Sequence, residues 1–239
     1  MTAPDAPALE IRQTADGSHT LFVPSMNEHY HSVNGAIQES MHVFIRAGLC
    51  RLTKESIRVL EVGFGTGLNA LLTLLEAERR EKLSIEYHAV ELYPLPASLT
   101  SGLNYAEQLC PGREELFASL HAAPWGEYAR ITPNFLLHKI KGDCNCCELP
   151  FSIDLLYFDA FAPDKQPEMW NRSLFDALYA RMSDGGLLTT YCAKGEVRRM
   201  MQKAGYSVER IPGPLGKREM LRASCYPSNA SIFSTKVER

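Results

Sequence analysis

The sequence has no long hydrophobic run, and this bears on where the protein can work. No stretch of its 239 residues approaches the roughly 18 uninterrupted apolar residues that a membrane-spanning helix needs. The first ten residues, MTAPDAPALE, have neither the basic start nor the apolar centre of a signal peptide. These absences argue against a membrane protein and against a secreted one. We therefore expect a soluble protein in the cytoplasm.

The cysteines lack the patterns that would make them structural. Seven is an odd number, and they are scattered along the chain, which argues against a disulfide framework. Cys144, Cys146 and Cys147 form a cluster, but C-x-C-C lacks the paired C-x-x-C spacing of common zinc sites, and no histidine follows closely. We expect reduced thiols in a surface loop and no metal.

The chain also lacks internal repeats and low-complexity linkers. With 45% hydrophobic residues, its length suits one sizeable core, with or without a small appendage. The net charge is −3, but residues 194–222 hold eight Lys or Arg against three Glu, a local +5. This basic region fits two interpretations, a footprint for a polyanion or a solvated helix face.

The most informative stretch that is present is residues 57–69, IRVLEVGFGTGLN. An apolar run ends in an acidic residue and is followed by glycine at positions 63, 65 and 67, which predicts a buried strand leading into a tight turn. The dinucleotide fingerprint G-x-G-x-x-G would need glycine where the chain has Leu68. G-x-G-x-G after a strand that closes in Glu61 favours an S-adenosylmethionine loop over a dinucleotide loop. The alternative is an ordinary glycine-rich turn.

A strand–helix–strand unit surrounds this loop. Leucines recur at helical spacing from Leu68 to about Arg80, and the apolar segment Leu83–Val90 follows. Glu91 ends that second strand, 24 residues beyond Gly67, close to where such units place a carboxylate that accepts both ribose hydroxyls. An ordinary exposed glutamate is the alternative.

The remaining elements predict an α/β fold with a mostly parallel sheet, covered by helices on both faces. Residues 8–23 read as a hairpin that turns at Asp16-Gly17, and Asn34–Leu49 reads as a helix. We expect residues 1–52 to form an N-terminal hairpin and helix extension, which either closes over the pocket or extends the sheet, and residues 53–239 to form one domain. Further expected strands are Phe135–Ile140, Ile153–Phe158, Leu187–Tyr191, Tyr206–Ile211 and Met220–Ala223. The last two are expected to form a hairpin with one antiparallel strand. Further expected helices are Asn171–Met182 and Gly195–Ala204.

Asp159 opens the segment that is richest in reactive groups. It leaves the strand Ile153–Phe158 at the edge of the sheet where a cofactor would lie, and prolines at 150, 163 and 167 hold the segment out of regular structure. Phe158, Phe161 and Trp170 supply aromatic faces beside the carboxylate, which suits a planar base or an amine. Alternatively, Asp159 caps a turn and the aromatic rings fill the core.

Four blocks in this sequence carry a family resemblance, in the order HYHSVNGAIQES, EVGFGTGLN, FDAFAPDKQPEMW and GKREML, from about Tyr30 to Leu221. Together they resemble the methyltransferase that completes 5-methylaminomethyl-2-thiouridine at the tRNA wobble position. In some bacteria that activity is half of a bifunctional enzyme whose other half is a flavin-dependent oxidase. No second glycine-rich fingerprint is present, so the chain resembles the stand-alone form, with a separate oxidase as a possible upstream partner.

The resemblance implies a class I, Rossmann-like methyltransferase fold that uses S-adenosylmethionine to methylate the exocyclic amine of 5-aminomethyl-2-thiouridine. It implies that Asp159 is the catalytic aspartate, that Glu91 holds the ribose and that Asp143 meets the adenine amino group. Glu39 falls on a family block and is assigned to the pocket. The cofactor loop would consist of Gly63, Phe64, Gly65, Thr66, Gly67 and Asn69.

For the substrate we expect an anticodon stem-loop whose flipped base enters an aromatic pocket that includes Phe161 and Trp170. The candidates for phosphate contacts are Lys194, Arg198, Arg199, Lys217 and Arg218. We expect Asp159 to orient the amine first and to act as a base second, because an unperturbed aspartate has a pKa near 3.9. Two alternatives remain: a small-molecule amine methyltransferase or aminopropyltransferase, and a catalytically silent module that binds cofactor or RNA.

Overall fold

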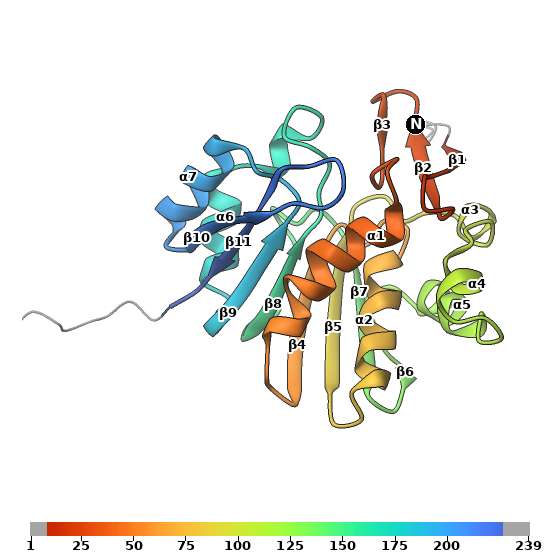
Figure 1. Cartoon of the computed structure of the whole chain (residues 1–239). Helices are drawn as coiled ribbons and strands as arrows, with labels where there is room; N and C mark the ends of the chain where they lie inside the picture. The colour runs from red at the N-terminus through yellow and green to blue at the C-terminus, as the bar shows by residue number, and fades with distance from the viewer. Residues whose placement is uncertain (1–8, 227–239) are drawn as a thin grey trace, which may run out of the picture.

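Two β-sheets organise the chain, for which a computed structural model describes residues 9–226 (Figure 1). The ends of the two expected regions, residues 1–8 and 227–239, lie outside the described part. The large sheet consists of β4 (Ser56–Val62), β5 (Ser84–Glu91), β6 (Tyr128–Thr132), β7 (Phe135–Lys141), β8 (Ile153–Phe158), β9 (Met182–Thr190), β10 (Ser207–Pro212) and β11 (Glu219–Ser224). The small sheet consists of β1 (Glu10–Gln13), β2 (His19–Val23) and β3 (Glu28–His29).

The large sheet has the strand order β10-β11-β9-β8-β4-β5-β7-β6. Its five central strands, from β9 through β8, β4 and β5 to β7, are parallel to one another. Near the C-terminus, β11 runs antiparallel to both β9 and β10, which confirms the predicted antiparallel strand. The edge strand β6, antiparallel to β7, was not predicted.

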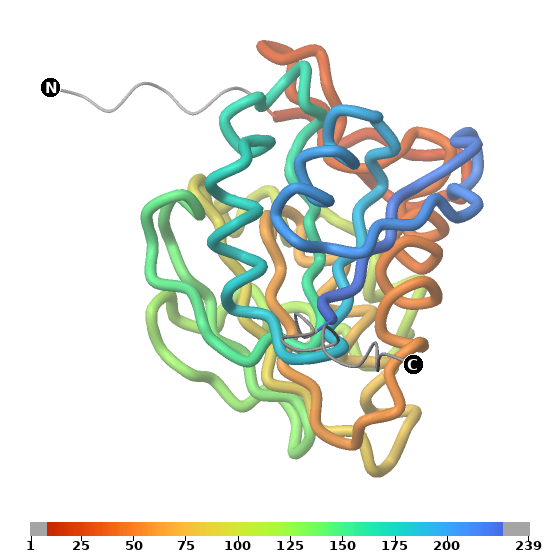
Figure 2. The backbone as a smooth tube through the Cα atoms, turned by 90° about the vertical axis from the view of Figure 1, so that its left-hand side faces the viewer, coloured from red at the N-terminus to blue at the C-terminus, as the bar shows by residue number. Residues whose placement is uncertain are grey.

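Helices cover both faces of this sheet, as Figures 1 and 2 show from two directions. One face packs against α1 (Ala36–Ser40), the π-helical turn η1 (Met41–Arg46), α2 (Leu68–Arg79), α4 (Tyr105–Leu109) and α5 (Glu115–Ala122). The other packs against α6 (Arg172–Tyr179) and α7 (Gly195–Ala204). The short elements are η2 (Leu49–Arg51), α3 (Ala97–Thr100) and η3 (Pro167–Met169).

Strand β4 shows how the sequence builds this layered core. Side chains alternate between the two faces of a strand, so Val59 joins the core on the α2 side, whereas Leu60 and Val62 join the core on the α6 and α7 side. Glu61 therefore points to the same face as Val59, although it is charged in water. Glu61 is thus an acidic residue with 0% exposure inside the core.

The helix predicted over residues 34–49 and a region without predicted elements both differ from the structure. The helix predicted over Asn34–Leu49 begins at Ala36 and continues as π-helical turns, in which Ala47 N–H donates to the His42 carbonyl five residues earlier. Residues 97–122, for which we predicted no element, contain α3, α4 and α5.

The predicted N-terminal hairpin is confirmed for the residues that the structure describes, with β1 and β2 paired antiparallel across the Asp16-Gly17 turn. Gly17 has φ of 82°, and Asp16 fixes the turn by accepting hydrogen bonds from the backbone of Ser18 and Gln38. The hairpin does not extend the large sheet. It pairs with β3 instead and stands above the ends of the central strands in Figure 1.

No helix within residues 9–226 has the length and apolar character needed to cross a membrane.

Candidate active site

A cavity of about 440 Å³ opens at the carboxyl ends of the central strands. From β4 the chain continues to β5, toward one edge of the sheet, and from β8 it continues to β9, toward the other edge. The cavity therefore lies where the strand order reverses, which is where open α/β sheets bind ligands. Residues from separate parts of the chain line it, among them the segment after β3, the glycine loop after β4, and the ends of β5, β7 and β8.

The glycine loop after β4 presents bare backbone to this cavity. Gly63, Gly65 and Gly67 all have positive φ, of 91°, 48° and 75°, which residues with a Cβ atom rarely adopt. A Cβ atom on Gly63 would stand 2.9 Å from the carbonyl oxygen of Asp159. The loop can therefore pass close to the segment that carries Asp159 only because position 63 is glycine.

Glu91 lines the cavity and also holds the loop in shape. Its two carboxylate oxygens accept hydrogen bonds from Gly65 N–H at 2.9 Å and from Tyr93 N–H at 2.9 Å. Burial raises the pKa of Glu91, and these backbone donors oppose the shift. Each oxygen keeps a second lone pair, so the carboxylate can still accept hydrogen bonds from a ligand. Bare backbone beside such an acceptor fits the nucleoside part of S-adenosylmethionine.

Asp143 lies beside Glu91, in the turn that follows β7, where Gly142 N–H donates to the Glu91 carbonyl at 3.0 Å. Gly142, Asp143 and Cys144 all line the cavity, and Asp143 Oδ1 accepts a hydrogen bond from Asn145 N–H at 2.8 Å. The cysteine cluster is only partly the surface loop that we predicted, because Cys144 is buried while Cys146 is exposed. Within residues 9–226 no group of three or more His, Cys, Asp or Glu side chains could hold a metal ion.

Asp159 lies at the bottom of the cavity and is tied to the helix that follows the glycine loop. Its Oδ2 accepts a hydrogen bond of 2.8 Å from Asn69 Nδ2. The pKa of Asp159 is raised to about 7, mainly by burial and also by the charge of Glu39, against the lowering effects of the Asn69 hydrogen bond and the charge of Lys217. A carboxylate with a pKa near 7 accepts a proton at neutral pH far better than an ordinary aspartate.

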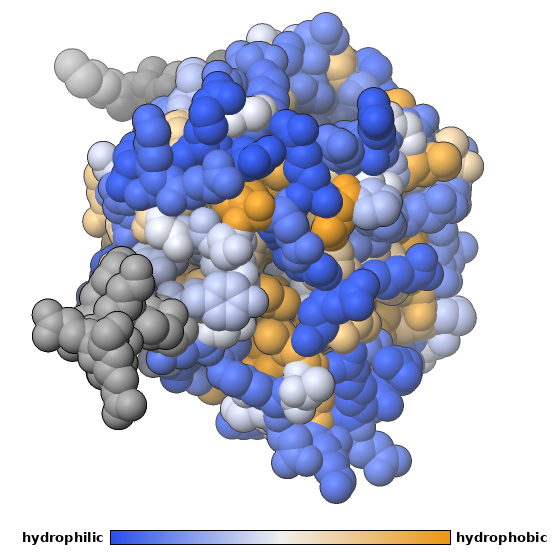
Figure 3. Space-filling view, turned by 60° about the vertical axis from the view of Figure 1, so that its left-hand side comes forward, coloured by the Kyte–Doolittle hydropathy of each residue, from blue (hydrophilic) through white to orange (hydrophobic). Residues whose placement is uncertain are grey.

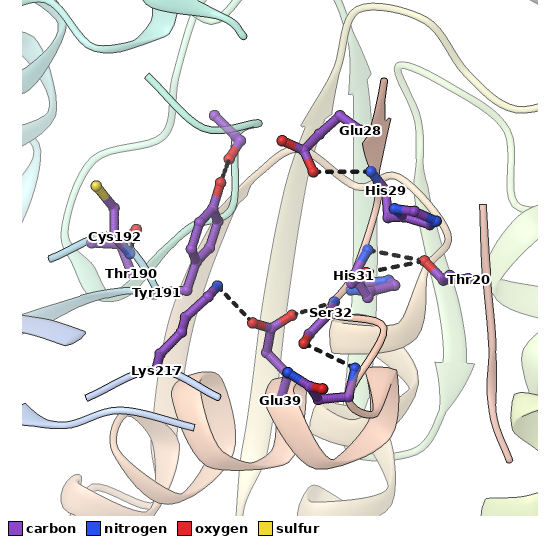
Figure 4. Close-up of polar contacts among 12 residues, drawn as sticks. Thr20, Glu28, His29, His31, Ser32, Glu39, Thr190, Tyr191, Cys192 and Lys217 are labelled. Carbon is purple, nitrogen blue, oxygen red and sulfur yellow. Dashed lines mark hydrogen bonds and ion pairs between the residues drawn. The ribbon is translucent and has the colours of Figure 1, made fainter. Parts of the chain in front are cut away.

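A second carboxylate, Glu39 of α1, faces the same cavity (Figure 4). Its Oε1 pairs with Lys217 Nζ at 2.8 Å, and its Oε2 accepts a hydrogen bond from Ser32 N–H at 2.8 Å. Lys217 Nζ also lies 3.9 Å from the centre of the Tyr191 ring. Tyr191 in turn donates its hydroxyl to the carbonyl of Ala160 at 2.9 Å, next to Asp159.

The segment after β3 covers the cavity from above. Tyr30 packs against the glycine loop, where a Cβ atom on Gly65 would lie 3.1 Å from its ring, and its ring meets that of Phe161 edge to face at 5.0 Å. His31 Nε2 lies 2.7 Å from Thr66 Oγ1, and burial lowers the pKa of His31 to about 4, so the imidazole is neutral. No residue of β1 or β2 lines the cavity, so the segment after β3, and not the hairpin itself, covers it.

The structure brings most of the predicted site residues to this one cavity. Trp170 is an exception: it is buried against Phe158 in the core below α6, and its Nε1 donates to the Phe161 carbonyl at 2.7 Å. The predicted residues that line the cavity are Glu39, Gly63, Phe64, Gly65, Thr66, Asn69, Glu91, Asp143, Asp159, Phe161 and Lys217. Those that do not are Gly67, Trp170, Lys194, Arg198, Arg199 and Arg218.

The sequence analysis missed Tyr30, His31 and Tyr191 as cavity residues. The first two stand in the block HYHSVNGAIQES, which was quoted for its resemblance without a role for its aromatic residues. Tyr191 immediately follows β9. Every residue that follows a parallel strand lies at the ligand-binding edge of the sheet, so this rule, applied to each strand, would have found it.

The parallel sheet with its antiparallel hairpin, and the glycine loop beside Glu91, define a class I S-adenosyl-L-methionine-dependent methyltransferase. A family model described as "S-adenosyl-L-methionine-dependent methyltransferase" matches residues 127–226. The chain is 33% identical over 215 residues to the tRNA 5-methylaminomethyl-2-thiouridine biosynthesis bifunctional protein MnmC of Pseudomonas paraeruginosa, covering 80% of this chain and 31% of that protein. It is 31% identical over 211 residues to the protein of the same name from Leptospira interrogans, covering 82% of this chain and 32% of that protein.

Among solved structures, MnmC2 from Aquifex aeolicus is similar to this chain with a TM-score of 0.76 and 29% identity, over 93% of this chain and 71% of that one. The chain thus belongs to the MnmC methyltransferase-domain family. It spans about a third of the length of the bifunctional relatives that it matches.

Proposed function

We propose that this protein transfers a methyl group from S-adenosyl-L-methionine to the exocyclic amine of 5-aminomethyl-2-thiouridine in tRNA, giving 5-methylaminomethyl-2-thiouridine. The observation that carries this proposal is the placement of Asp159, a half-buried carboxylate in a cavity that also contains the glycine loop and a second carboxylate, Glu39. Such a cavity suits a cation or an amine. The names of the bifunctional relatives point to the same modified nucleoside.

When bound, S-adenosyl-L-methionine supplies an electrophilic methyl group on a sulfonium. In this proposal the loop residues 63–66, with Asn69, hold the cofactor, while Glu91 accepts hydrogen bonds from its ribose and Asp143 from its adenine amino group. The enzyme's task is then to hold a neutral amine in line with the methyl group, roughly 3–3.5 Å from its carbon.

Asp159 is proposed to accept a proton from the amine and to hold its nitrogen in place. An alkylamine is mostly protonated at neutral pH and cannot attack until it loses a proton. We ranked the base role second because an unperturbed aspartate is a weak base. Burial, however, raises the pKa of Asp159 to about 7, so this carboxylate can both orient the amine and take its proton near neutral pH.

The basic residues of the C-terminal region are proposed to contact phosphates of the anticodon stem-loop. Lys194, Arg198 and Arg199 lie on the first turns of α7 and at its N-cap, and Arg218 lies in the neighbouring β10–β11 turn. The face that carries these elements is mostly hydrophilic, with hydrophobic residues in separate patches (Figure 3). Phosphate contacts of this kind position an RNA without reading its sequence. The amine itself would be supplied upstream by a flavin-dependent oxidase.

Methyl transfer can be tested directly. The protein is incubated with labelled S-adenosyl-L-methionine and tRNA that lacks only the final methyl group, and the RNA is digested to nucleosides. Label in 5-methylaminomethyl-2-thiouridine is the expected result. Label found instead in a free amine added as a competitor would indicate a small-molecule methyltransferase, and binding of cofactor without transfer to either substrate would indicate a catalytically silent module.

A further inference from the structure

Glu61 is an acidic side chain sealed in the core directly behind the proposed catalytic carboxylate. It has 0% exposure and does not line the cavity, so it is not placed to touch a ligand there. Its neighbours across the sheet are Ala89 of β5 and Tyr157 of β8. Neither of its carboxyl oxygens has a hydrogen-bond partner among the described residues. An ionised carboxylate buried in this way would cost several kcal/mol.

Two other buried polar atoms near Glu61 also lack partners. They are the hydroxyl of Tyr87, on the same face of the sheet, and Oδ1 of Asn69, at the start of α2. Asn69 and Tyr87 are polar side chains that act on the Glu61 carboxyl group and lower its pKa, whereas the charges of Asp159 and Glu91 raise it. Within residues 9–226, no cation is among the largest influences on the Glu61 pKa.

The orientation of the Asn69 amide indicates which of its two protonation states Glu61 adopts. Asn69 Nδ2 already donates to Asp159, so the end of the amide left for Glu61 is the acceptor Oδ1. An anionic Glu61 has no proton to offer this acceptor, and it would compete with Asp159 for the amide donor. A neutral carboxylic acid both donates to Oδ1 and accepts from the Tyr87 hydroxyl.

We propose that Glu61 is a neutral carboxylic acid and a positioning residue, which donates a hydrogen bond to Asn69 Oδ1 and thereby fixes the amide with Nδ2 aimed at Asp159. The resulting chain runs from Tyr87 through Glu61 and Asn69 to Asp159, with one donor and one acceptor at each step. Burial raises the pKa of Glu61 well above its usual range. The inference rests on the proposed role of Asp159, which it deepens by naming what holds that carboxylate in place.

The first test needs no RNA and no turnover. Carboxyl-carbon NMR of labelled aspartate follows the titration of Asp159 in the native protein, in Glu61→Gln and in Glu61→Leu. Glutamine keeps a donor for Asn69 and an acceptor for Tyr87, so the Asp159 midpoint in Glu61→Gln should stay within about 0.3 of the native value. If Glu61 were an anion, removing its charge would lower that midpoint, and such a decrease in Glu61→Gln would overturn the proposal.

Leucine removes the donor and frees the Asn69 amide. In Glu61→Leu the Asp159 midpoint should rise, because the Asn69 hydrogen bond that lowers the pKa is weakened. An infrared band of a protonated carboxylic acid at pH 9, present in the native protein and absent from Glu61→Gln, gives an independent readout. If Glu61→Leu does not fold, the glutamine variant and the infrared band still decide the matter, and absence of the band would count against the proposal.

Methyl transfer is the second test. Glu61→Leu should lower kcat at least about tenfold with an S-adenosyl-L-methionine Kd within about threefold of the native value, and Glu61→Gln should restore kcat at an unchanged pH optimum. A Glu61→Gln variant as defective as Glu61→Leu would refute the positioning role. If the native protein methylates no tRNA, the proposed function fails, while the NMR and infrared measurements still report on Glu61.

Discussion

Glu39 and Lys217 are 178 residues apart in the chain, yet they form an ion pair of 2.8 Å inside the cavity (Figure 4). Glu39 belongs to the first helix, whereas Lys217 belongs to the turn between the last two strands. The pair therefore joins the two ends of the fold over the proposed amine site. Lys217 was expected to contact phosphate, but its ammonium group is directed to Glu39 and the Tyr191 ring.

We predict that Lys217→Met lowers kcat/KM for the tRNA substrate about tenfold. Removing Lys217 leaves the buried Glu39 carboxylate without its cation, and it also removes a positive charge that lowers the pKa of Asp159. The combined variant with Glu39→Gln should then lose less than the sum of the two single losses, as expected for directly paired residues. Additive losses in this double-mutant cycle would show that the pair does not act as a unit.

Gly63→Ala should abolish detectable binding of S-adenosyl-L-methionine. The new methyl group would lie 2.9 Å from the Asp159 carbonyl, at a φ of 91° that alanine resists. Gly126→Ala is a matched control, since its φ is 83° and nothing lies within 4 Å of the added atom. The control should lose about 1 kcal/mol of stability and keep its cofactor affinity; calorimetric titration measures both affinities. An equal loss of cofactor affinity in the two variants would mean that backbone strain alone causes the loss.

Asp159→Asn should inactivate the enzyme and stabilise its fold at alkaline pH. The folded-state pKa of Asp159 is raised from 3.8 to about 7, so the stability tied to this group is complete below pH 3.8 and is lost as pH rises through about 7. Asparagine carries no charge and can still accept the Asn69 hydrogen bond.

The free energy of unfolding of the variant should therefore be about 2–4 kcal/mol higher than that of the native protein at pH 8.5. At pH 4 the two values should be nearly equal. Urea melts at the two pH values measure the difference, and turnover should fall at least about 100-fold. A difference that does not depend on pH would mean that Asp159 titrates normally.

The parts of the fold that sequence periodicity predicts well are those where one period dominates. Strand β8 and helix α7 have the predicted limits, because an apolar run interrupted only by Asp154 and an amphipathic pattern leave no competing interpretation. The segment 97–122 was missed because its helices are short, at four, five and eight residues. Such lengths show too few turns for a helical period to emerge.

The site residues likewise fall into those that the sequence predicts and those that it does not. The glycine loop and Asp159 directly follow strands of the large sheet and Glu91 ends one, so their place at one edge can be inferred from the sequence alone. The contacts of His31 with Thr66 and of Lys217 with Glu39 depend on how distant segments pack. Trp170 illustrates the limit for a single side chain, because its sequence neighbours suited both a pocket wall and the core position that it occupies.

The basic residues offer the last prediction, which separates phosphate contacts from ion pairs inside the protein. Each Lys or Arg that neutralises a phosphate should reduce the slope of log K against log salt by about 0.7–0.9 when it is removed. Arg199→Ala and Arg218→Ala, both exposed, should each weaken tRNA binding and reduce this slope. Lys217→Met should leave the slope unchanged, because its charge is already paired with Glu39.

Lys82→Ala is the matched control, since Lys82 is exposed just before β5, at the edge of the sheet opposite the cavity. Filter binding of the unmodified tRNA across a salt series measures all four slopes. A reduced slope in Lys82→Ala equal to that in Arg199→Ala would mean that the RNA is attracted by overall charge, which would remove the argument for a footprint on α7 and the β10–β11 turn. An affinity of the native protein that does not change with salt would exclude phosphate contacts altogether.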